Sequence, residues 1–190
     1  YRLASLINKI LDDRSEKKTI GFLSGHQEME ISGELQSFAS VLNQQYQVQT
    51  IAAEDGMPIN LESIDVMIIA SPKSRIGETH RESIKEYIYG GGKVFIAIEP
   101  VLVDFNQLAG ISNRDSSSDF VLSEFGISVE SDLVFDLQSN ETLSFGTGGA
   151  RSVYLPYPYW VKADVVDSKI GGEVNSVVMP WASSVGILNL

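Results

Sequence analysis

The chain has 190 residues, of which 43% are hydrophobic, so it is long enough to bury one core of ordinary domain size. Its 14 Lys and Arg against 25 Asp and Glu give a formal net charge of −11, which disfavours nucleic acid and anionic lipid surfaces as partners. Cysteine is absent, which excludes disulfides, thiolate zinc sites and cysteine nucleophiles. The longest apolar runs are far shorter than the roughly 20 residues of a membrane-spanning helix. No signal peptide opens the sequence, so we expect any export signal or membrane tether to lie outside this segment.

The first eighteen residues differ in character from the rest of the chain. They carry five basic and three acidic residues, whereas the remainder carries 14 − 5 = 9 basic and 25 − 3 = 22 acidic ones. Apolar residues at three- and four-residue spacing predict an amphipathic helix, and the polar run 12–18 predicts a linker. These apolar residues are Leu3, Leu6, Ile7, Ile10 and Leu11. The helix either packs on its own domain or forms a stalk near a membrane or a coiled-coil seam.

From residue 19 onward, short apolar runs alternate with helical periodicity, which is typical of βα units and a parallel sheet. Strands are predicted at 19–23, 46–51, 64–70 and 93–98. The helices between them have apolar faces made of Ile31, Leu35, Phe38, Val41 and Leu42, and of His80, Ile84, Tyr87 and Ile88. Right-handed crossovers place helices on both faces of such a sheet. The predicted fold class is therefore α/β, with a mostly parallel sheet of flavodoxin-like or amidotransferase-like type.

The C-terminal part is less regular and rich in short strand-like runs. A helix is predicted at 118–125, and strands at 143–145, 152–155, 161–166 and 174–179 are separated by glycine, proline or Asp-Ser turns. These antiparallel strands either extend the edge of the sheet or form a small β layer. The predicted organisation is a leader helix and linker at 1–18, an α/β core at 19–139, and a β-rich extension of the same domain at 140–190.

Several segments occur in an order that resembles a known family. They are TIGFLSGHQE at 19–28, IDVMIIASP at 64–72, IKEYIYGGGKVFIAIEP at 84–100 and LSEFGI at 122–127. Together they resemble the gliding-motility-type auxiliary components of ABC transport systems. The resemblance implies a periplasmic or cell-surface domain, tethered to the membrane by segments outside this one. It also implies partners, namely a permease and an ATPase supplied by other chains.

The helix–glycine–strand module at 84–100 is also similar to the one before the nucleophile of class I glutamine amidotransferase-like domains. There a cysteine follows the strand, whereas here Glu99 and Pro100 stand in its place. The glycine-rich runs at 90–92 and 146–149 lack the spacing of a phosphate loop or a dinucleotide fingerprint, and no Gly-x-Ser-x-Gly sequence occurs. We therefore expect a core that lacks the nucleophile, no enzymatic activity and no cofactor.

Five polar residues follow the predicted strands, namely His26, Glu28, Ser71, Lys73 and Glu99. Ligands of open α/β sheets bind outside the carboxyl ends of the strands, so these side chains can converge on one ligand-binding crevice. His26 and Glu28 alone are too few for a metal site, and we expect no metal. His26 can instead be structural, capping the next helix or satisfying groups of its own loop. The crevice supports a second hypothesis, a ligand-binding or hydrolase-like domain.

The segment 154–160 holds four aromatic residues and two prolines. Because Pro156 and Pro158 lack a backbone N–H, they predict an edge strand or a surface loop rather than a central strand. Tyr157, Tyr159 and Trp160 then form an interaction surface, and the alternative is that these rings fill a core or cover an edge strand. The first hypothesis for the function is thus a non-catalytic domain that binds other proteins of a membrane complex.

Overall fold

The computed structural model describes residues 17–104, 109–146, 152–166 and 174–188. The predicted leader helix lies outside the described residues. The chain forms two compact units, one of Tyr1–Glu99 and Arg114–Gly126, the other of Pro100–Asn113 and Ile127–Leu190. This grouping places residues 100–113 and 127–139 with the later strands, whereas the sequence pattern assigned them to the core. That the two parts fold as one domain stays a prediction.

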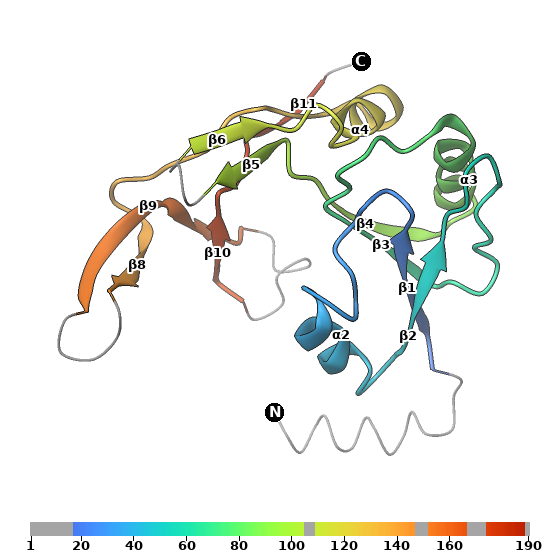
Figure 1. The fold of residues 1–190 in the computed structure, drawn as a ribbon, viewed down its shortest axis with the longest axis horizontal. Helices are drawn as coiled ribbons and strands as arrows, with labels where there is room; N and C mark the ends of the chain where they lie inside the picture. The colour runs from blue at the N-terminus through green and yellow to red at the C-terminus, as the bar shows by residue number, and fades with distance from the viewer. Residues whose placement is uncertain (1–16, 105–108, 147–151, 167–173, 189–190) are drawn as a thin grey trace. The chain divides into compact units, whose positions relative to one another are not determined.

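The first unit contains a four-stranded parallel sheet, which confirms the central prediction from the sequence (Figure 1). Its strands are β1 (Thr19–Ser24), β2 (Gln47–Ala52), β3 (Val66–Ala70) and β4 (Lys93–Ala97), in the order β2-β1-β3-β4. Near-continuous apolar runs suit β1 and β3 because strands inside a parallel sheet are covered on both faces. Since all four strands run the same way, the segments that follow them lie at one edge of the sheet.

The described residues of this unit form three helices: α2 (Gln36–Leu42), α3 (Glu78–Tyr89) and α4 (Ser118–Phe125). The helix predicted from residue 31 begins five residues later, because Gly33 and Leu35 both donate backbone hydrogen bonds to the Glu30 carbonyl and form a turn there. Its apolar face is only partly covered, with Phe38 49% and Val41 61% exposed. The end of α3 is as predicted, because Gly91 adopts φ +94°, which glycine tolerates without strain.

The core of the first unit lies around β1, β3 and the inner faces of α3 and α4. Met67, Ile69 and Ile84 are fully buried, and Phe120 of α4 is 1% exposed. Ion pairs join α4 to α3, with Lys85 Nζ 3.1 Å from a Glu124 carboxylate oxygen. Among the described residues, no helix combines the length and the apolar character needed to cross a membrane.

The second unit consists of antiparallel strands, as predicted for the C-terminal part. Its three-stranded sheet has the order β10-β9-β8, formed by β8 (Asn140–Phe145), β9 (Val153–Asp164) and β10 (Ser176–Pro180). Two smaller pairs are β5 (Val101–Asp104) with β6 (Ala109–Ser112), and β7 (Ile127–Val129) with β11 (Val185–Ile187). In the described part of the chain these strands pair with one another and leave the parallel sheet at four strands.

The prediction that Pro156 and Pro158 lie in an edge strand or a surface loop is corrected by the structure of β9. The sequence predicted separate strands at 152–155 and 161–166, but the structure has one strand through both, and it lies between β8 and β10. β10 pairs only with residues 160–164 of β9. Pro156 pairs with Thr142 of β8, the strand on the other side of β9. Pro156 and Pro158 therefore occupy the half of β9 that β10 does not reach, where a missing N–H breaks no bond to that neighbour.

Candidate functional site

The loop after β1 turns two polar side chains inward. Gly25 starts the loop at φ +146°, and a Cβ there would lie 2.4 Å from the Ala53 carbonyl oxygen, so only glycine fits. The Glu28 carboxylate folds back over the loop and accepts hydrogen bonds from the N–H groups of Gly25 (3.0 Å) and His26 (2.7 Å). His26 and Glu28 are 5% and 8% exposed, so both lie inside the protein rather than on a crevice wall.

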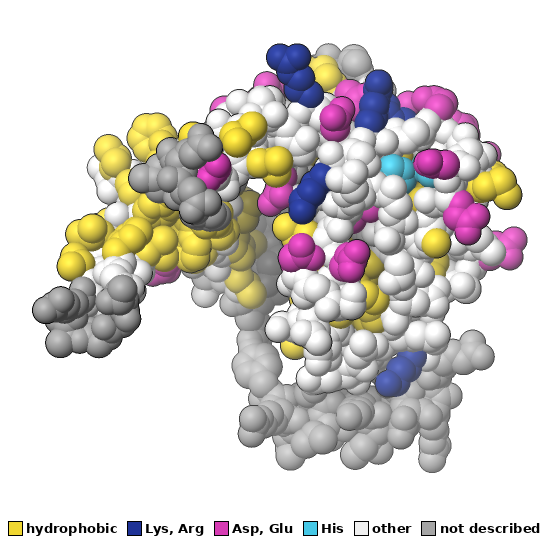
Figure 2. Space-filling view, in the orientation of Figure 1, with side chains coloured by type: hydrophobic (Ala, Val, Ile, Leu, Met, Phe, Trp, Pro, Cys, Tyr) yellow, Lys and Arg dark blue, Asp and Glu magenta, His cyan; other side chains and the backbone are white. Residues whose placement is uncertain are grey.

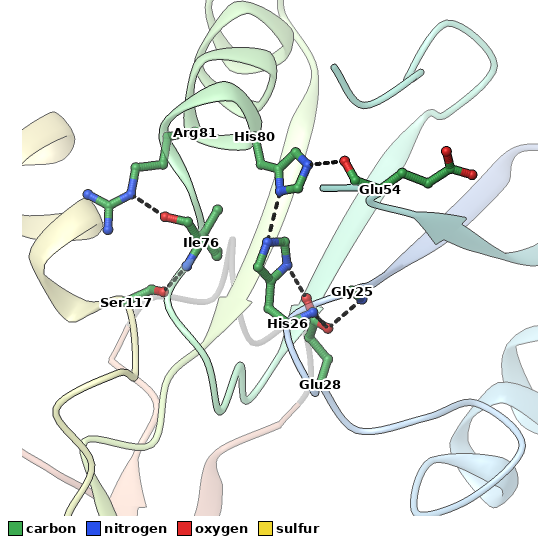
Figure 3. Close-up of polar contacts among 8 residues, drawn as sticks. All are labelled: Gly25, His26, Glu28, Glu54, Ile76, His80, Arg81 and Ser117. Carbon is green, nitrogen blue, oxygen red and sulfur yellow. Dashed lines mark hydrogen bonds and ion pairs between the residues drawn. The ribbon is translucent and has the colours of Figure 1, made fainter. Parts of the chain in front are cut away.

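His26 and Glu28 belong to a chain of hydrogen bonds that crosses three segments (Figure 3). His26 Nδ1 lies 3.1 Å from Glu28 Oε1, and His26 Nε2 lies 2.9 Å from Nδ1 of His80, on α3. His80 Nε2 lies 2.9 Å from the backbone carbonyl oxygen of Glu54, in the loop after β2. We call the side chains of Glu28, His26 and His80 the polar cluster.

The hydrogen bonds of the polar cluster fix the donor at each of its two ends. A carbonyl oxygen only accepts, so His80 Nε2 donates to the Glu54 carbonyl. The Glu28 carboxylate likewise accepts from His26 Nδ1. Between the two rings, one nitrogen donates and the other accepts.

The Glu28 carboxylate is held in its charged form. Burial raises the pKa of Glu28, but hydrogen bonds from the His26 side chain and from backbone N–H groups outweigh it, and the charge of His26 adds to them. The net result is a pKa below the usual value for glutamate. A charged carboxylate is therefore held inside the first unit by the His26 side chain and by backbone N–H groups.

The other predicted residues form a second pair close to the sheet. The Ser71 hydroxyl donates to a carboxylate oxygen of Glu99, and Ser71 N–H donates to the Ala97 carbonyl oxygen at 2.8 Å. Ser71 is 2% exposed and has φ +53°, a strained conformation for a residue with a side chain. Lys73 reaches His26 only through its backbone, whose N–H donates to the His26 carbonyl oxygen at 2.9 Å. The structure thus joins His26 to Glu28 and Ser71 to Glu99, with the Lys73 side chain exposed.

Sequence reasoning did not find the role of His80 or of Arg81. Arg81 is 8% exposed, donates from Nε to the Ile76 carbonyl oxygen at 2.7 Å, and forms an ion pair with Asp119 of α4 at 2.8 Å. Its guanidinium also lies 5.3 Å from the ring centre of Phe120. The only signal in the sequence was the position of both residues in the first turns of a predicted helix.

A pocket of about 230 Å³ opens beside β1, but none of the five predicted residues lines it. Its walls include Phe22, Ser24, Met29, Ile31 and Thr50. Over the described ranges, no group of three His, Asp or Glu side chains is arranged to hold a metal ion. The hydrogen bonds of His26 and His80 connect the loop after β1 and the loop after β2 to α3. The polar atoms of the cluster are bonded to one another and to the Glu54 carbonyl oxygen.

The second unit presents a very different surface. Side chains alternate along a strand, so Leu155, Tyr157 and Tyr159 share one face of β9, and the pairing adds Phe145 of β8 to that face. We call this the aromatic face. Phe145 is 44%, Leu155 49% and Tyr159 39% exposed, and Figure 2 shows hydrophobic side chains gathered over these strands.

The rings of the aromatic face form a continuous row. Ring centres are 6.1 Å apart from Phe145 to Tyr157 and again from Tyr157 to Tyr159, and 6.0 Å apart from Tyr159 to Phe135. Neighbouring ring planes are tilted by 49° to 58°, so the row is ridged rather than flat.

Trp160 lies in the part of β9 where the pairing with β8 shifts register. Its ring packs edge-on against Trp181, with centres 5.3 Å apart. Its indole Nε1 is buried and has no hydrogen-bond partner among the described residues. The Trp181 ring also lies 6.4 Å from that of Tyr157, so Trp160 and the aromatic face have this neighbour in common.

Comparison with solved structures shows that this fold is similar to a known one. The mmIFT52 N-terminal domain matches with a TM-score of 0.64 and 19% sequence identity, over 90% of this chain and 69% of that chain. At this identity the likeness concerns the fold alone. No curated protein matches the chain.

The sequence of the chain identifies its family. The model of a family described as an ABC-type uncharacterized transport system matches residues 17–189. The chain belongs to this family and is thereby an auxiliary component of an ABC-type transport system. Membership implies membrane transporter partners in general.

Proposed function

We propose that this chain is a non-catalytic domain that works outside the cytoplasm, beside the permease and ATPase of an ABC-type transport system of the gliding-motility type. The observation that carries the proposal is the aromatic face, a row of rings in which Phe135, Phe145 and Tyr159 are exposed and Tyr157 is half-buried. Exposed aromatic side chains offer a large contact area at low entropic cost, and they are typical of protein interfaces. We assign this face to contact with a membrane subunit of the system.

The non-catalytic part of the proposal rests on how the polar groups are used. A nucleophile needs a base within hydrogen-bond reach, and both ring nitrogens of His26 are already bonded to Glu28 and His80. The sheet order β2-β1-β3-β4 supports a core of flavodoxin-like or amidotransferase-like type. In an amidotransferase-like core the nucleophilic cysteine follows the strand that corresponds to β4. Here Glu99 follows β4, so the core lacks that nucleophile.

The position outside the cytoplasm is part of the same proposal. It follows from the resemblance of the sequence to tethered components and agrees with a chain that contains no cysteine to be oxidised. The net charge of −11 keeps the domain away from anionic lipid headgroups. We therefore expect protein subunits, and not the lipid surface, to hold the aromatic face.

Copurification tests the docking role. Changing Tyr157 and Tyr159 together to Ser should weaken copurification of the membrane subunits with the tagged full-length protein, because two rings of the row are lost. The free energy of unfolding should stay within about 1 kcal/mol of wild type, since Tyr159 is 39% exposed and Tyr157 is only half-buried. Tyr154→Ser is the matched control, because Tyr154 is 70% exposed on the opposite face of the same strand. Equal loss of copurification in both variants, or a large loss of stability in the double variant, contradicts the proposal.

One observation favours the second candidate function, a hydrolase-like or ligand-binding domain. Ser71 combines a strained backbone with a position at the end of β3, and strained residues at strand ends are common at catalytic sites. If this candidate is correct, the purified protein hydrolyses glutamine or ester substrates, and Ser71→Ala or His26→Ala abolishes the reaction. We expect no turnover by the wild-type protein.

A further inference from the structure

The strand β10 forms one edge of the three-stranded sheet in the second unit, as far as the described residues go. Its five residues are all exposed, with Val177 40%, Val178 39% and Met179 44% exposed. Edge strands usually carry charged side chains, prolines or bulges that keep other strands away. The opposite edge strand, β8, carries Glu141, whereas β10 has no charged residue and its one proline, Pro180, stands at its end.

The hydrogen bonds at the two ends of β10 show how its backbone is oriented toward β9. The Asn175 carbonyl oxygen accepts a hydrogen bond from the Val165 N–H at 2.9 Å, and the Trp181 N–H donates to the Tyr159 carbonyl oxygen at 2.8 Å. The register between these two points is continuous. In an antiparallel pair such bonds recur at every second residue, so the odd-numbered residues of 175–181 turn their backbone groups toward β9.

The even-numbered residues of β10 therefore turn their backbone groups away from β9, toward the open edge. These residues are Ser176, Val178 and Pro180. Ser176 and Val178 each present an N–H and a carbonyl oxygen there, and Pro180 presents a carbonyl oxygen only. Such a row of donors and acceptors is a template for another strand.

Two copies of this edge fit each other when they run antiparallel around a two-fold axis. In the register that overlaps β10 along its whole length, Val178 of one copy lies opposite Val178 of the other, and the two exchange both of their backbone hydrogen bonds. Ser176 then lies opposite Pro180, so its N–H donates to the Pro180 carbonyl oxygen. Every N–H that β10 turns outward thereby has a partner, although Pro180 lacks one.

Side chains and charge also favour a second copy of the chain as the partner. In this register Val177 lies opposite Met179 at a non-hydrogen-bonded position, where the side chains of an antiparallel pair are closest. The net charge of −11 makes two copies repel each other wherever their acidic groups meet. Residues 174–190 include no charged residue, so pairing at β10 brings no like charges into direct contact within this segment.

We propose that the chain forms a symmetric dimer through β10, in which the three-stranded sheets of two copies join into one continuous sheet. The proposal does not rest on the assignment of the aromatic face to a membrane subunit. Pairing uses the backbone edge of β10, whereas the aromatic face is made of side chains on β8 and β9. A dimer of this kind presents two aromatic faces.

Disulfide crosslinking tests the register directly, because the chain contains no cysteine of its own. A hydrogen-bonded antiparallel pair has its Cα atoms about 5.5 Å apart, within the range of about 4.4–6.8 Å that a disulfide spans. Under mild oxidation, Val178→Cys in the full chain should therefore give mostly disulfide-linked dimer on a non-reducing gel. Val166→Cys is the control, because Val166 is 98% exposed and open to random collisions. It should give about tenfold less dimer, since no pairing aligns its thiols.

Sedimentation velocity measures the pairing without a crosslink. The mass of the wild-type chain should rise from one copy to two between about 1 and about 200 µM, since small interfaces are weak. Val178→Lys places two like charges opposite each other and should remain monomeric over this range. Val166→Lys adds the same charge outside β10 and should dimerise like the wild type.

A wild-type mass that stays at one copy, equal crosslinking of the two cysteine variants, or a dimer that Val178→Lys retains overturns the proposal. Growth beyond two copies also overturns it, because pairing of β10 with a different edge such as β8 gives an open polymer rather than a closed dimer. If Val178→Lys does not fold, the crosslinking comparison decides.

Discussion

The strands β3 and β10 are both rich in aliphatic residues and have opposite surroundings. In β3, Met67 and Ile69 are fully buried, whereas in β10, Val177, Val178 and Met179 are 39% to 44% exposed. The same residue types therefore stabilise the first unit by filling its core and leave the second unit with apolar surface in contact with water. The difference agrees with the proposal that the second unit is used for contact with another protein.

Truncation in the two strands should give the largest contrast. Ile69→Ala leaves a cavity in a fully buried site and should lower the free energy of unfolding by about 2–5 kcal/mol. Val177→Ala, at a position 40% exposed, should change it by about 0.5 kcal/mol or less. Denaturant unfolding of both variants measures the difference, and comparable losses would show that the second sheet is as well packed as the first.

A backbone change in the loop after β1 should have the next largest effect. Gly25→Ala places a methyl group against the Ala53 carbonyl oxygen and imposes a strained φ, so it should destabilise the protein by about 1–3 kcal/mol. Gly56→Ala is the matched control, because Gly56 also has a positive φ but nothing lies within 4 Å of its added Cβ. Thermal unfolding should show a clearly larger loss for Gly25→Ala, and equal losses would mean that the contact with Ala53 is unimportant.

A smaller effect is expected at the ion pair between α3 and α4. Burial raises the pKa of Asp119, but Arg81 and Arg75 outweigh it and hold the pKa below its usual value. Asp119 therefore stabilises the fold above about pH 4, the range of a free aspartate, and this contribution disappears as the pH falls through its lowered pKa. Because its side chain is half exposed, we expect Asp119→Asn to cost about 1 kcal/mol or less at pH 7.

The pH dependence supplies the control for this prediction. The stability difference between wild type and Asp119→Asn should vanish near pH 2, where both side chains are neutral. A difference that persists unchanged at that pH would mean that the ion pairs with Arg75 and Arg81 contribute nothing.

The periodicity of the first unit was sufficient to predict its strands, because burial on both faces leaves an unbroken apolar run in β3. The sequence pattern did not predict β9 as one strand, because whether Pro156 and Pro158 fit there depends on how far the neighbouring strand β10 extends. Pro156 and Pro158 suggested an edge, and only the pairing shows that β10 ends before it reaches them. Local pattern does not report how far a neighbouring strand extends.

Local pattern was also insufficient to predict the whole polar cluster. His26 and Glu28 are two residues apart, so their contact could be expected from the sequence. The partner that completes the cluster, His80, is 54 residues from His26 and comes into place only through the crossover from β3 to α3. Tyr157 and Tyr159 were predicted as surface residues from composition, but the row they form with Phe145 and Phe135 depends on strand register.

Site-specific photo-crosslinking in membranes that contain the whole transport system tests the central claim most directly. A photoreactive phenylalanine analogue replaces Tyr159 on the aromatic face or, as control, Tyr89 of the first unit, which is 72% exposed. We predict crosslinks from position 159 to a membrane subunit and none from position 89. Crosslinks from position 89 alone, or none from position 159 in an assembled system, would contradict the assignment of the aromatic face as the docking surface.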